Sequence, residues 1–151
     1  MLIREATIAD APLLAPLFEA WDHPLPVGEI GKIIDDWLAA PSSRMLVAEN
    51  SAALVGFVAV TARPGLSNAR PVAHLSGLVV DANLRRTGVG RALLDAAERL
   101  AQVWGCSRVE LSSSLSRDAA HRFYPDAGYE DSTVHHAFYA KRLPDPGSPA
   151  D

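Results

Sequence analysis

Segment 85–90 combines two arginines with two closely spaced glycines, and this combination suits the binding of a phosphate. It reads Arg85-Arg86-Thr87-Gly88-Val89-Gly90. Glycines lack a Cβ atom, so the backbone there can turn tightly and approach a ligand. A helix that begins after Gly88 would direct its unpaired first-turn N–H groups and the positive end of its dipole toward the same point. We therefore predict a cradle for a phosphate or pyrophosphate, with a purely structural strand-to-helix turn as the alternative.

Two common phosphate motifs do not describe this segment. A dinucleotide-binding turn has a third glycine, and Leu93 occupies that position. A nucleotide-binding P-loop has a lysine and then a serine or threonine after its last glycine, and neither follows Gly90. A nucleotide-binding or phosphate-binding module of unrelated fold would have one of these motifs. The sequence therefore argues against this function.

The elements on either side of the glycine turn form a strand–helix–strand unit. Residues 72–81 are a long apolar run, which is typical of a central strand covered on both faces. A helix follows the turn, with Gly105 as its expected end, and residues 108–111 are the next strand. The apolar residues of the helix lie on one stripe, which consists of Val89, Ala92, Leu93, Ala96, Ala97, Leu100, Val103 and Trp104.

The N-terminal half predicts a strand, two helices and a hairpin. Thr7 and Asp10 have the spacing of a capping box for the first helix, and two prolines separate this helix from a second that begins at Val27. Trp21 and Trp37 fit the apolar stripes of these helices, so we expect both in the core. The expected strands are residues 2–6, 45–48 and 54–61, with the hairpin turn at residues 50–52 and a loop at residues 63–71.

The C-terminal part predicts a short helix and further strands. Ser116 is a suitable cap for the helix, and Pro125 is expected to end it at Tyr124. Strands are expected from Tyr129 and over residues 135–143. We predict a single domain over residues 1–143, followed by a disordered tail over residues 144–151, which contains three prolines and a glycine.

The composition limits the class of protein. The 151 residues suffice for one domain, and a content of 48% hydrophobic and 21% charged residues is that of a globular chain. The net charge of −4 argues against broad nucleic-acid binding and weakly favours a cationic substrate. Cys106 is the single cysteine, so no internal disulfide is expected, and no metal-ligand spacing occurs. Residues 1–6 contain no long apolar run, and no stretch is long enough to span a membrane, so we expect no signal peptide and a cytoplasmic protein.

The glycine turn and a second motif together resemble the GCN5-related N-acetyltransferases. In this family a strand with a Leu-x-Val pattern precedes an Arg-x-x-Gly-x-Gly turn, and a later block reads Ala-x-x-Phe-Tyr-x-x-x-Gly-Tyr. The resemblance covers about residues 2–143, and the wording Ala-His-Arg-Phe-Tyr is similar to the small aminoglycoside-acetyltransferase-like members. The matching residues are Leu78, Val79, Val80, Arg85, Gly88 and Gly90 in the first motif, and Ala120, Phe123, Tyr124, Gly128 and Tyr129 in the second.

The resemblance implies an α/β fold in which a twisted, mostly antiparallel sheet of six to seven strands is flanked by four helices. Acetyl-coenzyme A would lie in a cleft between two splayed parallel strands, without a metal ion. Its pantetheine arm would pair with the backbone of one strand like an added strand. Its pyrophosphate would lie on the glycine turn. The cofactor-binding residues that the resemblance implies are Leu78, Val79, Val80, Arg85, Arg86, Thr87, Gly88, Val89, Gly90, Arg91, Arg117 and Phe123.

The implied chemistry is the direct attack of a primary amine on the thioester. Tyr124 matches the family's tyrosine and is the candidate acid for the leaving thiolate. Relatives often have a glutamate where this chain has Ser76, so His74, two residues earlier on the strand, is the candidate base. A water-mediated relay is an equal alternative, and Glu110, His135 and His136 are further candidates.

Two functions remain open from the sequence. The first is an N-acetyltransferase that acts on a primary amine of a small molecule or peptide, for which a cationic acceptor and a homodimer are expected. The second is an inactive protein that binds acyl-coenzyme A as a sensor or subunit.

Overall fold

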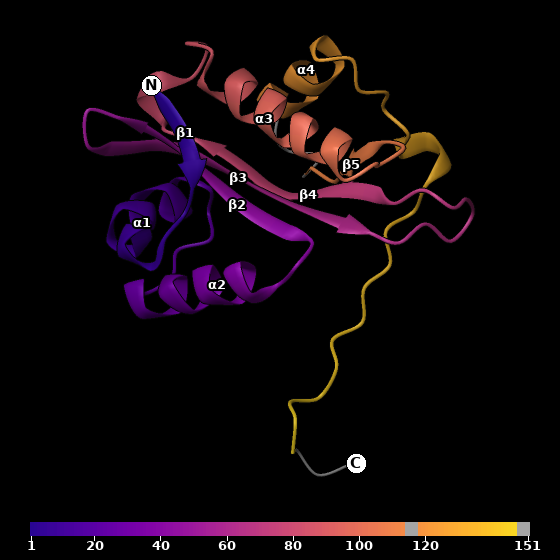
Figure 1. Ribbon diagram of the computed structural model, residues 1–151, viewed down its shortest axis with the longest axis horizontal. Coiled ribbons are helices and arrows are strands. Elements are labelled where there is room, and N and C mark those ends of the chain that lie inside the picture. The colour runs from indigo at the N-terminus through magenta and orange to yellow at the C-terminus, as the bar shows by residue number, and fades with distance from the viewer. Residues whose placement is uncertain (114–117, 148–151) are drawn as a thin grey trace. The chain divides into compact units, whose positions relative to one another are not determined.

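The computed structural model describes residues 1–113 and 118–147, which form two compact units divided at residue 112 (Figure 1). The expected helix cap at Ser116 and the cofactor-binding role of Arg117 fall outside the described residues. The first unit holds β1 (Leu2–Glu5), α1 (Ala11–Ala20), α2 (Val27–Ala39), β2 (Ser43–Asn50), β3 (Ala53–Arg63), β4 (Val72–Val80), α3 (Val89–Val103) and β5 (Val109–Leu111). The second unit holds α4 (Asp118–Asp126) and a short 3-10 turn, Thr133–His135.

Within the described residues, the sheet has five strands in the order β1-β2-β3-β4-β5. Neighbouring strands are antiparallel except β4 and β5, which are parallel. The mixed, mostly antiparallel sheet is as predicted, but the predicted count of six to seven strands is wrong. Residues 129–132 and 136–145 form no strand. The pairs His135–His136 and Lys141–Arg142 interrupt the apolar alternation there, so these residues have no single apolar face.

Arg4 and Asp10 fix the start of the fold. The carboxylate of Asp10 is buried and accepts bonds of 2.8 and 2.9 Å from the guanidinium of Arg4, which also donates to Glu49 on β2. The backbone N–H of Thr7 donates to the same carboxylate over 2.8 Å. The predicted capping box is present, and it encloses a 3-10 turn, Ile8–Asp10, that leads directly into α1. These bonds hold the pKa of Asp10 below its usual value, with the Arg4 hydrogen bond as the largest cause. One carboxylate therefore ties β1 to the entry of α1.

Helices cover both faces of the sheet. Figure 1 shows α1 and α2 on one face and α3 on the other. On the first face, Leu14, Ile30 and Ile34 are fully buried against Phe57 and Val79 of the sheet. On the second, Leu93 and Leu94 of α3 are fully buried. Burial of such a side chain stabilises the fold by about 1.5–3 kcal/mol, so these two layers hold the first unit together.

Gly56 lets α3 approach β3 closely. A Cβ atom on Gly56 would lie 2.8 Å from the carbonyl oxygen of Val79 and 2.9 Å from Cδ1 of Leu93. The absence of a side chain at Gly56 therefore sets how closely α3 packs against β3.

The helix α4 continues past the point at which the sequence predicts its end. Pro125 was expected to end it at Tyr124, yet α4 includes Pro125 and runs to Asp126. A proline in the last turn removes only one backbone donor, and the helix closes beyond it because the N–H of Ala127 donates to the carbonyl of Phe123 over 3.1 Å. Gly128, with φ +94°, then ends the helix.

Candidate functional site

The pairing between the two parallel strands, β4 and β5, ends at Leu75 and Leu111. The β4–β5 ladder consists of three pairs, Ala73–Val109, His74–Glu110 and Leu75–Leu111, after which β5 ends. The strand β4 continues to Val80, so no described strand pairs with that edge from Ser76 onward. An extended molecule with amide groups can add to such an edge. The predicted backbone-binding residues Leu78, Val79 and Val80 lie on this open part.

A β-bulge stands where this pairing ends. Ala59 of β3 faces Gly77, and the next residue, Val60, faces Leu75, so Ser76 has no partner on β3. The bulge changes which residues of β4 share a face. Thr61, Ala59 and Phe57 lie two residues apart on β3, but their partners on β4 are His74, Gly77 and Val79, so the spacing on β4 is three residues across the bulge and two beyond it. The prediction that His74 and Ser76 share a face rested on strict alternation, which the bulge breaks.

Trp21 packs on β4 directly beside the bulge. A Cβ atom on Gly77 would lie 3.1 Å from Cη2 and 3.2 Å from Cζ2 of its indole. The same ring makes edge contacts with Phe57 at 5.9 Å and with His23 at 4.5 Å between ring centres. Sequence reasoning assigned Trp21 to the core and missed this place. The sequence feature that could have indicated this contact is Gly77, since a glycine inside a strand often marks the close approach of another group.

His74 is half-buried and lies beside Glu110. The two residues are neighbours across the parallel ladder, and the Glu110 carboxylate accepts a bond of 2.6 Å from Arg108. Burial is the main cause that lowers the pKa of His74 below 6.5, the positive charge of Arg63 lowers it further, and the charge of Glu110 raises it. The imidazole is therefore neutral at pH 7 and can accept a proton. The other candidates, His135 and His136, are exposed in the second unit.

The glycine turn leaves the start of α3 uncapped. Gly88 is the N-cap residue with φ +93°, and no side chain caps it within the described residues. The first bond of the helix runs from the N–H of Ala92 to the carbonyl of Gly88 over 3.0 Å, so the preceding N–H groups have no partner within the helix. No acidic residue lies in the first turn. This end of α3 can therefore bind an anion.

The arginines around the turn differ in their surroundings. Arg85 and Arg86 are exposed, and Arg86 has φ +66°, which is unusual for a residue with a side chain. Arg91 forms an ion pair of 3.0 Å with Asp95 along α3. The hydroxyl of Thr87 donates to the carbonyl of Leu84, which closes the turn. Arg85 and Arg86 are thus the two cations of the turn that form no ion pair in the described part of the chain.

Tyr124 and Phe123 lie on α4 in the second unit. The ring centre of Tyr124 is 5.2 Å from that of Phe123 and 5.7 Å from that of Tyr129, both in edge contact. Burial raises the pKa of the Tyr124 phenol to about 12. The phenol is therefore protonated throughout the neutral range and can donate a hydrogen bond.

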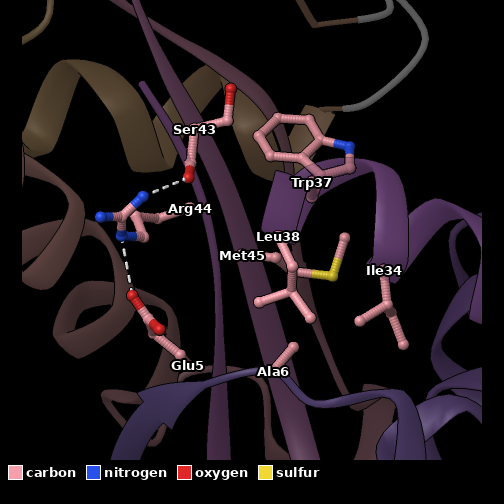
Figure 2. A pocket seen from close by; sticks show the side chains of 8 residues that line it. All are labelled: Glu5, Ala6, Ile34, Trp37, Leu38, Ser43, Arg44 and Met45. Atoms are coloured by element: carbon pink, nitrogen blue, oxygen red, sulfur yellow. Dashed lines mark hydrogen bonds and ion pairs between the residues drawn. The ribbon is translucent and has the colours of Figure 1, made fainter. Parts of the chain in front are cut away.

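A separate hollow of about 170 Å³ lies between α2 and the strands β1 and β2 (Figure 2). Its apolar lining includes Trp37 and Met45. Figure 2 shows the guanidinium of Arg44 between the carboxylate of Glu5, at 2.7 Å, and the carbonyl of Ser43, at 2.8 Å. This hollow contains none of the predicted site residues.

No helix among residues 1–113 and 118–147 is long and apolar enough to cross a membrane. In the same residues, no group of three or more His, Cys, Asp and Glu side chains is arranged to hold a metal ion.

The comparisons with known proteins agree on one family. The acetyltransferase (GNAT) family matches residues 12–129. An aminoglycoside N(6')-acetyltransferase type 1 of Stenotrophomonas maltophilia is 31% identical over 135 residues, which cover 86% of this chain and 86% of that protein. A chloroplastic GCN5-related N-acetyltransferase 7 of Arabidopsis thaliana is 34% identical over 71 residues, so the chain matches only 26% of that protein's length. The solved structure of AAC(6')-Iy with a bisubstrate analogue, CoA-S-monomethyl-acetylneamine, has a TM-score of 0.80 over 94% of this chain and 98% of that one, at 21% identity.

Proposed function

Because the chain belongs to the acetyltransferase (GNAT) family, we propose that it transfers an acetyl group from acetyl-coenzyme A to a primary amine of a small molecule or peptide. The observation that carries the proposal is the end of the β4–β5 pairing at Leu75, which leaves the β4 edge from Ser76 to Val80 without a described partner strand. The uncapped start of α3 follows on the same chain. An open strand edge and an anion-binding helix start are the two features that a pantetheine arm and a pyrophosphate require.

The cofactor-binding residues act mainly through their backbone. The N–H groups of residues 86–91 would hold the pyrophosphate, with Arg85 and Arg86 adding positive charge. The backbone of Leu78, Val79 and Val80 would pair with the amide groups of the pantetheine arm. Since Val79 is buried in the core and Leu78 and Val80 are half-buried, their side chains are free to pack while their backbone binds.

The transfer is an attack of the neutral amine nitrogen on the thioester carbonyl carbon. A C–N bond forms, the C–S bond breaks, and a backbone N–H near Val79 or Val80 would polarise the carbonyl. His74, neutral at pH 7 and placed beside the end of the β4–β5 pairing, would accept the proton that the amine loses. A water relay to solvent is the alternative route for this proton.

Tyr124 would serve the leaving sulfur. With a pKa of about 12, its phenol keeps its proton at any pH at which the enzyme works. Full transfer to a thiolate, whose own pKa is about 8.5, would be unfavourable, so the phenol stabilises the developing charge chiefly by donating a hydrogen bond.

The acceptor we propose is a small cationic amine. The partly buried indole of Trp21 lies beside the bulge, and aromatic faces attract cations. The exposed residues Asp22 and His23 follow it directly, and the chain has a net charge of −4. The Stenotrophomonas relative is named for an aminoglycoside, a molecule with several amines. We place this activity in the cytoplasm, where a single thiol such as Cys106 stays reduced.

The second candidate function is a sensor or subunit that binds acyl-coenzyme A without turnover. The exposed Ser76 at the bulge favours it, since a hydroxyl is not a base at neutral pH. Calorimetry with coenzyme A and a thiol-release assay over a panel of mono- and polyamines separate the two functions. We expect binding and turnover. Binding without turnover of any amine would support the sensor, and absence of binding would refute both.

A further inference from the structure

The hollow between α2 and the strands β1 and β2 lies on a part of the fold that the proposed acetyl transfer does not use (Figure 2). It exists because β1 is shorter than β2. The strand β1 pairs with β2 only as far as Glu5, so no described strand covers this edge of β2 at Ser43 and Arg44. The N–H of Ala6 still donates to the carbonyl of Met45 over 2.9 Å, and the chain then leaves the sheet. The hollow thus occupies the space beyond the end of β1.

One side of the hollow is apolar. Ile34 of α2 and Met45 of β2 are 0% and 6% exposed, whereas Trp37 is half-buried and Leu38 is 53% exposed nearer the opening. An apolar cavity of about 150 Å³ can hold a molecule of the size of benzene. The volume of about 170 Å³ is therefore sufficient for a branched aliphatic group, which is smaller than benzene.

The other side of the hollow carries one cation and one anion (Figure 2). Nε of Arg44 lies 2.7 Å from Oε1 of Glu5, and Nη1 of Arg44 donates to the carbonyl of Ser43 over 2.8 Å. Nη2 of Arg44 and Oε2 of Glu5 take part in neither contact, so the guanidinium keeps donors and the carboxylate keeps acceptor positions for a ligand. The two side chains are 36% and 55% exposed, so water screens their attraction and a ligand can share either partner at little cost.

This pair of charges selects a ligand that carries both signs. A carboxylate without an amine could bind Arg44, but it would lie beside the carboxylate of Glu5 and be repelled by it. An ammonium without a carboxylate would meet the same difficulty at Arg44. An α-amino acid has both groups on one carbon atom, so its carboxylate can face Arg44 while its ammonium faces Glu5. Its side chain leaves the same carbon atom and can enter the apolar side of the hollow.

We propose that the hollow binds a free α-amino acid with a branched aliphatic side chain, such as leucine. The side chain would pack against Ile34, Trp37 and Met45, the guanidinium of Arg44 would donate to the carboxylate, and the ammonium would donate to Glu5. This site shares no residue with the proposed acetyl-transfer site, so the inference does not rest on the proposed function. Because the ligand would contact β1, β2 and α2 together, its binding would stabilise the folded chain.

Calorimetry on the full chain with four probes tests the class of ligand. The probes are leucine, glycine, isocaproate and isoamylamine. Isocaproate and isoamylamine keep the branched group of leucine but lack its ammonium or its carboxylate, respectively. We expect each of them to bind about tenfold or more weakly than leucine, because a hydrogen bond to a charged group is lost. Glycine, which has no side chain, should also bind more weakly. Absence of leucine binding, or equal affinity for leucine and glycine, would overturn the proposal.

Two variants test the roles of the charges. Glu5→Gln should weaken the binding of leucine and strengthen that of isocaproate, because it removes the anion that repels a carboxylate. Arg44→Gln should weaken the binding of leucine and strengthen that of isoamylamine. A damaged fold would weaken every probe, so it cannot produce these opposite changes. Lys32→Gln is the matched control, because Lys32 forms an exposed ion pair of 2.8 Å with Asp36 on α2, outside the hollow. Unchanged leucine affinity in the Glu5 and Arg44 variants would refute the site.

Tryptophan fluorescence shows where leucine binds, since leucine also has a primary amine and could enter the acetyl-transfer site as an acceptor. Trp37 lines the hollow, whereas Trp21 lies against Gly77. We expect Trp37→Phe to abolish the fluorescence change that leucine causes and Trp21→Phe to leave it in place. The reverse result would place leucine at the acceptor site. It would overturn this inference without contradicting the proposed function, so the two can fail separately.

Discussion

The indole of Trp21 lies against Gly77 so closely that a Cβ atom there would come within 3.1 Å of its Cη2 atom. Trp21 follows the last residue of α1, and Gly77 is the first residue after the bulge of β4. The contact therefore joins the end of α1 to the point where the β4–β5 pairing ends. It gives Trp21 a place beside the candidate site and not only in the core.

The first prediction concerns this contact. Gly77→Ala forces the indole to move by a few tenths of an ångström, and overpacking of this kind costs about 1–3 kcal/mol. We expect a lower free energy of unfolding, measured by urea denaturation, and a higher KM for the acceptor amine. In a Trp21→Leu background the same substitution has no ring to displace, so its cost should vanish. An equal cost in both backgrounds would show that Trp21 is not the group that opposes a side chain at Gly77.

The second prediction concerns the anion cradle. Gly90→Asp places a negative charge in the first turn of α3, where the pyrophosphate is proposed to bind, and should weaken coenzyme A binding at least about tenfold by calorimetry. Gly28→Asp is the matched control, because Gly28 is likewise the second residue of a helix and has no atom within 4 Å of an added Cβ. Gly88→Asp would combine the added charge with backbone strain, since the φ of +93° at Gly88 is unfavourable for a residue with a side chain. Equal affinity in the Gly90 and Gly28 variants would refute the cradle.

The third prediction concerns Tyr124. Tyr124→Phe removes the hydroxyl and keeps the ring contacts with Phe123 and Tyr129, so the fold should persist. We expect kcat to fall by roughly 10²–10³, as for the loss of one hydrogen bond to a developing negative charge, with unchanged coenzyme A affinity. Because the phenol pKa is about 12, the wild-type rate should show no decline due to Tyr124 below about pH 11. Tyr139→Phe, at an exposed ring, is the control.

The first unit of the fold could be predicted from the sequence because its signals are local and agree. The Thr7–Asp10 capping box, the hairpin at residues 50–52, the apolar strand from Val72 and the helix between Gly88 and Gly105 were all predicted and are all confirmed. The two motifs also predicted the family, which the match over residues 12–129 confirms. The spacing of apolar residues, the capping residues of a helix and the glycines that end it each depend on only a few neighbouring residues. They can therefore be recognised in a single sequence.

The remainder depends on contacts between distant residues. The bulge at Ser76 depends on the pairing register between β3 and β4, and the local sequence around Ser76 does not indicate that register. The place of Trp21 depends on the same register through Gly77. Residues 135–143 were predicted as a strand from a weak alternation, but a strand needs a partner edge, and residues 136–143 pair with no described strand. The roles of Tyr124 and the cofactor-binding residues stay predictions.

The last prediction decides how the amine loses its proton. The pKa of His74 is below 6.5, so if His74 is the base, kcat/KM should rise with pH along a limb that lies below pH 6.5. Glu110 raises this pKa and Arg63 lowers it, so Glu110→Gln should move the limb to lower pH and Arg63→Gln should move it to higher pH. His74→Ala should remove the limb. These opposite shifts are measured in the pH profile and cannot come from a general loss of stability.

The same pKa fixes the sign of the effect on folding. His74 binds a proton less readily in the folded chain than in the unfolded chain, so the unfolded state takes up more protons as the pH falls through 6.5. The free energy of unfolding should therefore decline on acidification through the pKa of folded His74, and His74→Gln should reduce that decline. If the limb of kcat/KM instead follows the pKa of each acceptor amine and ignores both charge variants, the proton leaves through water. His74 would then be a structural residue of β4, even though its contribution to acid sensitivity would remain.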